Sequence, residues 1–216
     1  MDLIDRRYHG YYSTSRNDWH LQLINKHLLH ARSEPPYRAI FLAGTMGVGK
    51  GHVLRQWKAN GTLSLPNYVW NDSDYFKTLI PETATLEELA PELAATLVHR
   101  ESSYISELLL WETLARGAST IVEGTLKDAE WYASFFARIR TAYPHYSIEI
   151  LHVDAPWDVI CERVERRAKV TGRHVPLSVI RDAYDRVPVA VERLQPLVDR
   201  YFYVDNSVDE KVSSTT

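Results

Sequence analysis

The 216-residue sequence predicts an α/β fold, with a doubly wound, mostly parallel sheet of about five strands and helices on both faces. Two observations carry this prediction. Short apolar runs of strand length alternate with longer amphipathic stretches of helical period along most of the chain. In addition, a glycine-rich loop at residues 44–51 separates the first of these apolar runs from a helix.

The glycine-rich loop has the sequence G-T-M-G-V-G-K and fits the phosphate-binding spacing G-x-x-x-x-G-K. A buried strand is expected before it at 39–43, and a helix opens at Lys50 and ends near Gly61. The glycines allow successive backbone N–H groups to face one anion, while the lysine reaches the terminal phosphates. The fold is therefore expected to be that of a P-loop NTPase. The predicted nucleotide-binding residues here are Gly44, Thr45, Met46, Gly47, Val48, Gly49, Lys50, Gly51 and His52.

One position of the loop departs from the motif. A serine or threonine normally follows the lysine, because its hydroxyl binds Mg²⁺, and here the residue is Gly51. Two alternatives are open at this point: other groups hold the metal, or the loop is degenerate.

Composition excludes several classes of function. A net charge of −3 gives no basic surface for nucleic acid, and no apolar run approaches the length of a membrane span. The N-terminus does not resemble a signal peptide, and Cys161 is the single cysteine, which excludes internal disulfides. We expect a cytoplasmic protein with neither nucleic acid nor a membrane as its partner.

Periodicity and cap residues predict the remaining elements. Residues 1–15 are expected to form an arm without regular period. Helices are expected at 17–29, 75–79, 85–90, 91–116, 129–142 and 156–169, with further helical stretches to 199 punctuated by Pro188 and Pro196. Asp128 is a predicted N-cap, and strands are expected at 68–71, 120–122, 148–153 and 201–204. The predicted division is an N-terminal arm and helix at 1–36, a P-loop kinase domain at 37–207 and a flexible tail at 208–216.

Carboxylates follow the predicted strands, at the sheet edge where α/β proteins bind ligands. Phosphoryl transfer to an alcohol requires a phosphate cradle, cations and a carboxylate that accepts the hydroxyl proton. Asp72 and Asp74 follow the second strand and are candidates for this general base, or alternatively loop and cap aspartates. Glu123 ends the third strand and could orient a metal or its water; the alternative is a solvated glutamate.

A basic segment follows the fourth strand. Arg163 and Arg167 are four residues apart on one helical face, and Arg166 and Arg173 lie nearby. We interpret the segment as a helical, arginine-bearing lid that hinges at 171–172 and stabilises transition-state charge. The alternative is an exposed basic helix paired with neighbouring glutamates.

Five motifs, in this order, make residues 37–207 resemble the zeta-toxin-type kinases, a P-loop kinase family whose bacterial toxin members phosphorylate UDP-N-acetylglucosamine. They are the phosphate loop, D-S-D-Y-F-K at 72–77 ahead of I-P at 80–81, H-R-E-S at 99–102, E-G-T at 123–125, and R-x-x-x-R at 163–167 with T-G-R-x-V-P at 171–176.

The resemblance implies roles for individual residues. Asp74 is implied to be the general base, with Asp72 as the second choice. Lys50, Arg167 and Arg173 are implied to neutralise the phosphates, and Arg163 and Asn206 to bind the nucleotide. The implied acceptor-binding residues are Asp72, Asp74, Lys77, Glu101, Glu123 and Thr125.

The predicted function is thus transfer of phosphate from ATP (or GTP), with Mg²⁺, to a small-molecule acceptor such as a sugar nucleotide. If Gly51 is tolerated, Mg²⁺ is expected to be held by Asp74, Glu123 and water instead. An inhibitory protein partner is a further expectation. The N-terminal 35 residues could be its docking site, or alternatively just the first helix of the fold. Two alternatives stay open: a nucleotide-binding module without transferase activity, and a polynucleotide or nucleoside kinase of the same fold.

Overall fold

The computed structural model describes residues 3–65, 67–171 and 175–208. The chain falls into two compact units. The first unit consists of residues 1–40, 66–124 and 137–147, and the second of residues 41–65, 125–136 and 148–216. The predicted boundaries at 36 and 207 stay a prediction, and the tail from 209 lies outside the described residues.

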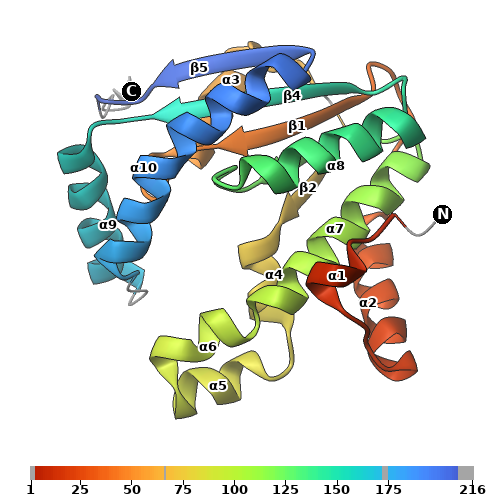
Figure 1. Ribbon diagram of the computed structural model, residues 1–216, viewed down its shortest axis with the longest axis horizontal. Coiled ribbons are helices and arrows are strands. Elements are labelled where there is room, and N and C mark those ends of the chain that lie inside the picture. The colour runs from red at the N-terminus through yellow and green to blue at the C-terminus, as the bar shows by residue number, and fades with distance from the viewer. Residues whose placement is uncertain (1–2, 66, 172–174, 209–216) are drawn as a thin grey trace, which may run out of the picture. The chain divides into compact units, whose positions relative to one another are not determined.

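The five predicted strands form one parallel sheet, in the order β2-β3-β1-β4-β5 (Figure 1). The apolar character of the runs explains their burial, because strands of a parallel sheet are covered on both faces. All but the first residue of β1 are buried, as are the six central residues of β4. The strands are β1 (Arg38–Ala43), β2 (Val69–Asp72), β3 (Thr120–Glu123), β4 (Ser147–Asp154) and β5 (Arg200–Asp205). Helices flank the sheet, so the predicted fold class is confirmed.

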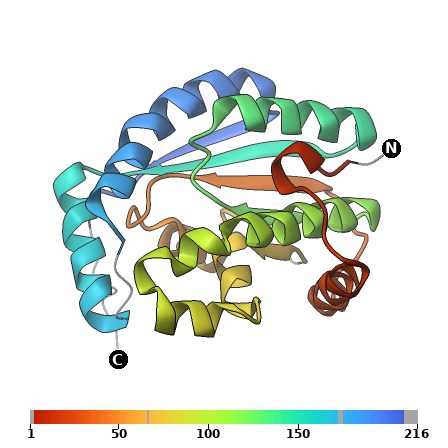
Figure 2. The same cartoon turned by 60° about the horizontal axis from the view of Figure 1, so that its bottom comes forward.

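The helices of the first unit pack around α7 (His99–Ala115). This helix contacts strands β2 and β3 as well as four other helices: α1 (Arg6–His9), α2 (Thr14–His27), α4 (Ser73–Leu79) and α6 (Pro91–Leu97). Figures 1 and 2 both show α1 and α2 beside α7. Ile105 and Leu109, one helical turn apart, are fully buried in the unit's core together with Phe76 of α4. A further helix, α5 (Thr83–Leu89), packs on α4 and α6.

The second unit contains α3 (Lys50–Ala59), α9 (Trp157–Thr171), α10 (Leu177–Leu194) and the 3₁₀ turn Gln195–Leu197, and α8 (Ala129–Ala142) begins in it. Helix α10 carries a continuous apolar stripe, whose buried members are Ile180, Ala183, Val187, Ala190, Val191 and Leu194. The helix continues through Pro188. Burial of the stripe on both sides of the proline offsets the lost backbone hydrogen bond, which costs about 3 kcal/mol.

Three sequence expectations were wrong. The N-terminal arm contains a short helix, α1, capped by Asp5. Helix α2 begins at Thr14 rather than 17, because the Ser13 hydroxyl accepts a hydrogen bond from the Arg16 N–H at 3.3 Å. The single helix expected at 91–116 is two helices, α6 and α7. Val98, with φ −89° and ψ −5°, is the residue at which one ends and the other begins.

Candidate functional site

The phosphate loop lies between β1 and α3 in the second unit, as predicted. Its glycines are required by the backbone: Gly44 has φ +140° and Gly49, the N-cap of α3, has φ +93°. A Cβ atom at Gly44 would lie 2.4 Å from the Val153 carbonyl oxygen. At Gly49 it would lie 2.3 Å from Nδ2 of Asn206. Both positions therefore require glycine, as the phosphate-binding motif predicts.

Lys50 is the first residue of α3, and its side chain turns back over the loop. Its Nζ donates hydrogen bonds to the carbonyl oxygens of Gly44 at 2.8 Å and Thr45 at 3.3 Å. The residue is only 9% exposed. The ammonium is therefore held against the phosphate loop, where a bound phosphate would offer it a stronger, charged acceptor than a carbonyl.

The Val48 carbonyl fixes the middle of the loop. It accepts a buried hydrogen bond from Nδ2 of Asn206 at 2.8 Å and another from Nη1 of Arg163 at 3.3 Å. The backbone N–H of Asn206 donates to the Asp154 carbonyl at 2.7 Å. Both predicted nucleotide-binding residues are thus at the loop, and their observed contacts hold its backbone.

Of the other predicted phosphate-binding arginines, Arg167 is exposed on α9, four residues from Arg163. Arg173 and the glycine of the expected hinge lie outside the described residues. Thr125, which was grouped with the acceptor residues, belongs to the second unit. Its carbonyl accepts from the Gly44 N–H at 3.2 Å, so it supports the start of the phosphate loop.

A cavity of about 300 Å³ opens beside the phosphate loop. It is lined by one face of α3 and by the end of β5 and the residues after it: His52, Val53, Gln56, Val204, Asp205, Asn206, Ser207 and Val208. A cavity next to a phosphate loop, lined by valines and by several polar groups, suits the base of a nucleotide. Sequence reasoning missed Gln56 and Val204. Gln56 lies about one helical turn after the predicted His52, and Val204 lies two residues before the predicted Asn206.

The first unit holds the predicted carboxylates. Asp72 and Glu123 are register partners at the ends of β2 and β3. Oδ1 of Asp72 accepts hydrogen bonds from the N–H groups of Asp74 at 2.9 Å and Tyr75 at 3.3 Å, which makes Asp72 the N-cap of α4. Asp74 lies in the first turn of that helix with its side chain 44% exposed, and Lys77 Nζ is 2.9 Å from its carboxylate. Oδ1 of Asp72 thus serves as a helix cap, whereas the carboxylate of Asp74 pairs with Lys77.

Glu101 on α7 is bound by two residues of α2. Its Oε1 accepts from Arg16 Nε and His20 Nε2, both at 2.6 Å, and its Oε2 accepts from Arg16 Nη2 at 3.0 Å. Arg16 also contacts both carboxylate oxygens of Glu82, at 2.6 and 3.1 Å. Burial acts to raise the pKa of Glu101, but the hydrogen bonds from His20 and Arg16 outweigh it and lower the pKa to about 2. Glu101 is therefore an ionised group in the folded protein.

These residues border a second cavity, of about 480 Å³, within the first unit. It is lined by Tyr11, Tyr12, Ser13, Arg16, Ile80, Glu82, Leu86, Leu97, Val98 and Glu101. Burial, and then the nearby Glu101 carboxylate, raise the pKa of Tyr12 to about 12, so its hydroxyl stays protonated at neutral pH. Sequence reasoning found Glu101 but missed Arg16 and His20. Their only local signal was a pair of basic side chains four residues apart.

The described residues include no helix that is both long and apolar enough to cross a membrane.

Comparisons with known proteins place the chain in a family. A search of curated proteins returned no match. The fold is similar to that of a protein of the PezAT chromosomal toxin–antitoxin system of Streptococcus pneumoniae. The TM-score is 0.75 at 14% identity, over 95% of this chain and 80% of that one. It is also similar to a candidate kinase of Chloroflexus aurantiacus, with a TM-score of 0.56 at 21% identity, over 82% of this chain and 91% of that one. The family model described as Zeta toxin matches residues 23–213, and the chain therefore belongs to the zeta toxin family.

Proposed function

We propose that the chain is an ATP-dependent phosphotransferase that transfers the γ-phosphate to a hydroxyl of a sugar nucleotide such as UDP-N-acetylglucosamine. Membership of the zeta toxin family supports a P-loop kinase-type function. The observation that carries the finer proposal is that two neighbouring aspartates, Asp72 and Asp74, have different positions and contacts at the start of α4. Oδ1 of Asp72 is engaged in capping α4, and the side chain of Asp74, on the first turn of the same helix, is 44% exposed.

Asp74 is the general base in this proposal. A carboxylate within hydrogen-bond reach of the acceptor hydroxyl takes its proton as the oxygen attacks phosphorus. Lys77 holds the Asp74 side chain in one orientation through the 2.9 Å ion pair. Asp74 also lies in the first turn of α4, where the positive end of the helix dipole interacts favourably with a carboxylate.

The phosphate loop supplies the nucleotide site. Its backbone N–H groups bind the phosphates, Lys50 neutralises their charge, and the 300 Å³ cavity takes the base. Arg163, Arg167 and Arg173 add positive charge as the γ-phosphoryl group leaves. Mg²⁺ favours oxygen ligands, and the carboxylates of Asp74 and Glu123 fit this preference. When bound, it neutralises charge on the β- and γ-phosphates.

Two alternatives remain as outcomes of a test. A nucleotide-binding module without transferase activity would bind ATP and leave every acceptor unmodified. A polynucleotide or nucleoside kinase would phosphorylate an oligonucleotide or nucleoside instead of a sugar nucleotide. We further propose that an inhibitory protein partner exists, because the S. pneumoniae protein of similar fold is part of a toxin–antitoxin system.

The test is a phosphate-transfer assay with labelled ATP and Mg²⁺ across sugar nucleotides, nucleosides and a 5′-hydroxyl oligonucleotide. Asp74→Asn should lower transfer at least ~10²-fold, because a general base typically contributes that much or more. Nucleotide binding should persist in this variant.

Asp72→Asn is the matched control. Asparagine caps helices about as well as aspartate, so α4 stays formed while the carboxylate at 72 is lost. We expect this variant to keep most of its transfer activity. Loss in Asp72→Asn together with normal activity in Asp74→Asn would reverse the assignment of the base.

A further inference from the structure

The cavity in the first unit has a wall that the zeta toxin family match does not cover. Four of its lining residues, Tyr11, Tyr12, Ser13 and Arg16, come from the segment that precedes residue 23, where the family match begins. These four residues are here called the N-terminal wall. Since they lie outside the matched pattern, they are positions at which this chain is free to differ from the sequence that the family shares.

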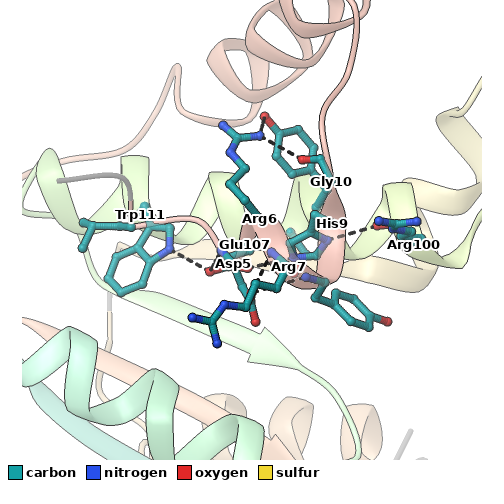
Figure 3. A network of polar contacts seen from close by, with 12 residues as sticks. Asp5, Arg6, Arg7, His9, Gly10, Arg100, Glu107 and Trp111 are labelled. Carbon is teal, nitrogen blue, oxygen red and sulfur yellow. Dashed lines mark hydrogen bonds and ion pairs between the residues drawn. The ribbon is translucent and has the colours of Figure 1, made fainter.

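The N-terminal wall is fixed to α7 at two places. The first is the buried Glu107, whose side chain is 2% exposed (Figure 3). Its carboxylate accepts from His9 Nε2 at 2.8 Å, Arg138 Nη1 at 3.0 Å, Trp111 Nε1 at 3.2 Å and the Asp5 N–H at 3.3 Å. A buried carboxylate with these partners resists displacement, because losing one of them would leave charge unpaired in the interior. The segment that leads into the wall is thereby anchored.

The second anchor is Arg16 itself. It binds Glu101 and Glu82 and lies over the Trp19 ring at 4.8 Å. Tyr12 packs against the rings of Tyr104 at 4.8 Å and His20 at 4.9 Å. The segment is thus anchored both before and after Tyr11. Tyr11 itself borders the cavity and is 84% exposed.

The cavity lies within reach of a substrate bound at Asp74. Ile80, which lines the cavity, directly follows the last residue of α4 and is six residues after Asp74. At about 1.5 Å per residue these positions are ~9 Å apart along the helix axis, which exceeds the width of one sugar ring. An acceptor with its reactive hydroxyl at Asp74 would need a second ring or a long substituent to enter the cavity.

The lining suits a polar ring. Tyrosine rings offer faces for stacking, while Tyr12 and Ser13 provide hydroxyls and Glu82 and Glu101 provide carboxylates. Ile80, Leu86, Leu97 and Val98 form the apolar part. We propose that the N-terminal wall binds the part of the acceptor remote from its reactive hydroxyl, a sugar or nucleobase ring, and so selects the acceptor; this rests on the proposed kinase function.

The experiment compares Tyr11→Ala, Tyr11→Phe and Tyr8→Ala with the full-length wild-type chain. Tyr8 is the matched control, since it is a 44% exposed tyrosine of the same segment that is not among the cavity's lining residues. Titration calorimetry measures binding of UDP-N-acetylglucosamine, and steady-state transfer assays measure KM for this acceptor and, separately, for ATP.

We expect Tyr11→Ala to raise the dissociation constant and the acceptor KM about three- to tenfold, as loss of one aromatic contact does. The KM for ATP should not change. Tyr11→Phe should restore binding, because it keeps the ring, and Tyr8→Ala should resemble the wild type.

Equal acceptor binding by Tyr11→Ala and the wild type would overturn the proposal, as would a wild type that binds no UDP-N-acetylglucosamine. Binding that depends on Tyr11 without any phosphate transfer would support the wall and refute the kinase function. Phosphate transfer with unchanged kinetics in Tyr11→Ala would support the kinase function and refute the role of the N-terminal wall.

Discussion

Replacing Gly51 by serine and by alanine separates the two consequences of having glycine in this position. Gly51 is the second residue of α3, and a Cβ atom there would meet only Nη1 of Arg55, at an ordinary contact distance of 3.5 Å. Both side chains therefore fit. Only serine restores the hydroxyl that the phosphate-loop motif normally offers to Mg²⁺.

The effect on stability follows from helix propensity. Glycine costs about 0.5–1 kcal/mol relative to alanine inside a helix, and serine recovers roughly half of this. At ~2.1 cal/mol/K per residue, the unfolding entropy of this chain is on the order of 450 cal/mol/K. Alanine should accordingly raise Tm by about 1–2 °C and serine by about 1 °C.

The effect on the metal is measured by titrating Mg²⁺ into the ATP complex of each variant. If the loop holds Mg²⁺ as related motifs do, Gly51→Ser should lower the half-saturating Mg²⁺ concentration about tenfold, as one added ligand group does. Gly51→Ala should leave it unchanged. Identical Mg²⁺ titrations for serine and alanine would refute the reasoning about the metal, and a fall in Tm for Gly51→Ala would refute the reasoning about space.

Two further predictions concern Glu101 and Asn206. Because Glu101 has a pKa of about 2 when folded and an ordinary value of 4.5, its stabilisation is complete above pH 4.5 and is lost as the pH falls towards 2. In urea titrations at pH 5, 4 and 3, Glu101→Gln should reduce the loss of unfolding free energy between pH 5 and pH 3 by about 2 kcal/mol. The control Glu130→Gln, whose side chain is 85% exposed in the wild type, should not change this loss, and equal losses in the two variants would contradict the prediction. Asn206→Ala removes the buried donor to the Val48 carbonyl and should weaken ATP binding about tenfold in calorimetry, with Tyr203→Ala as the exposed control on β5. Unchanged ATP affinity would show that Arg163 suffices to hold the loop.

Local signals account for what was predictable from the sequence. The phosphate loop, its flanking strand and helix, and the Asp128 cap of α8 all depend on residues within a few positions of one another. The strands were found because their apolar runs leave no alternative to burial. The sequence also predicts Asp72 and Asp74 as the candidate general bases, and the structure adds that Asp72 caps α4.

The missed features depend on partners distant in sequence. Arg16 and Glu101 are 85 positions apart, and nothing in the period of either segment identifies the other. Likewise, the break at Val98 carries no glycine or proline. It places α6 and α7 on separate paths, a result of tertiary packing that outweighs a continuous helical pattern.

The hydrogen bond between Asn206 and Val48 joins positions 158 residues apart. The phosphate loop is synthesised well before the amide that holds its centre. During synthesis, the hydrogen bond to the Val48 carbonyl can form only after β5 and Asn206 have been added to the chain. A polypeptide that stops before residue 206 carries the complete glycine motif without this support.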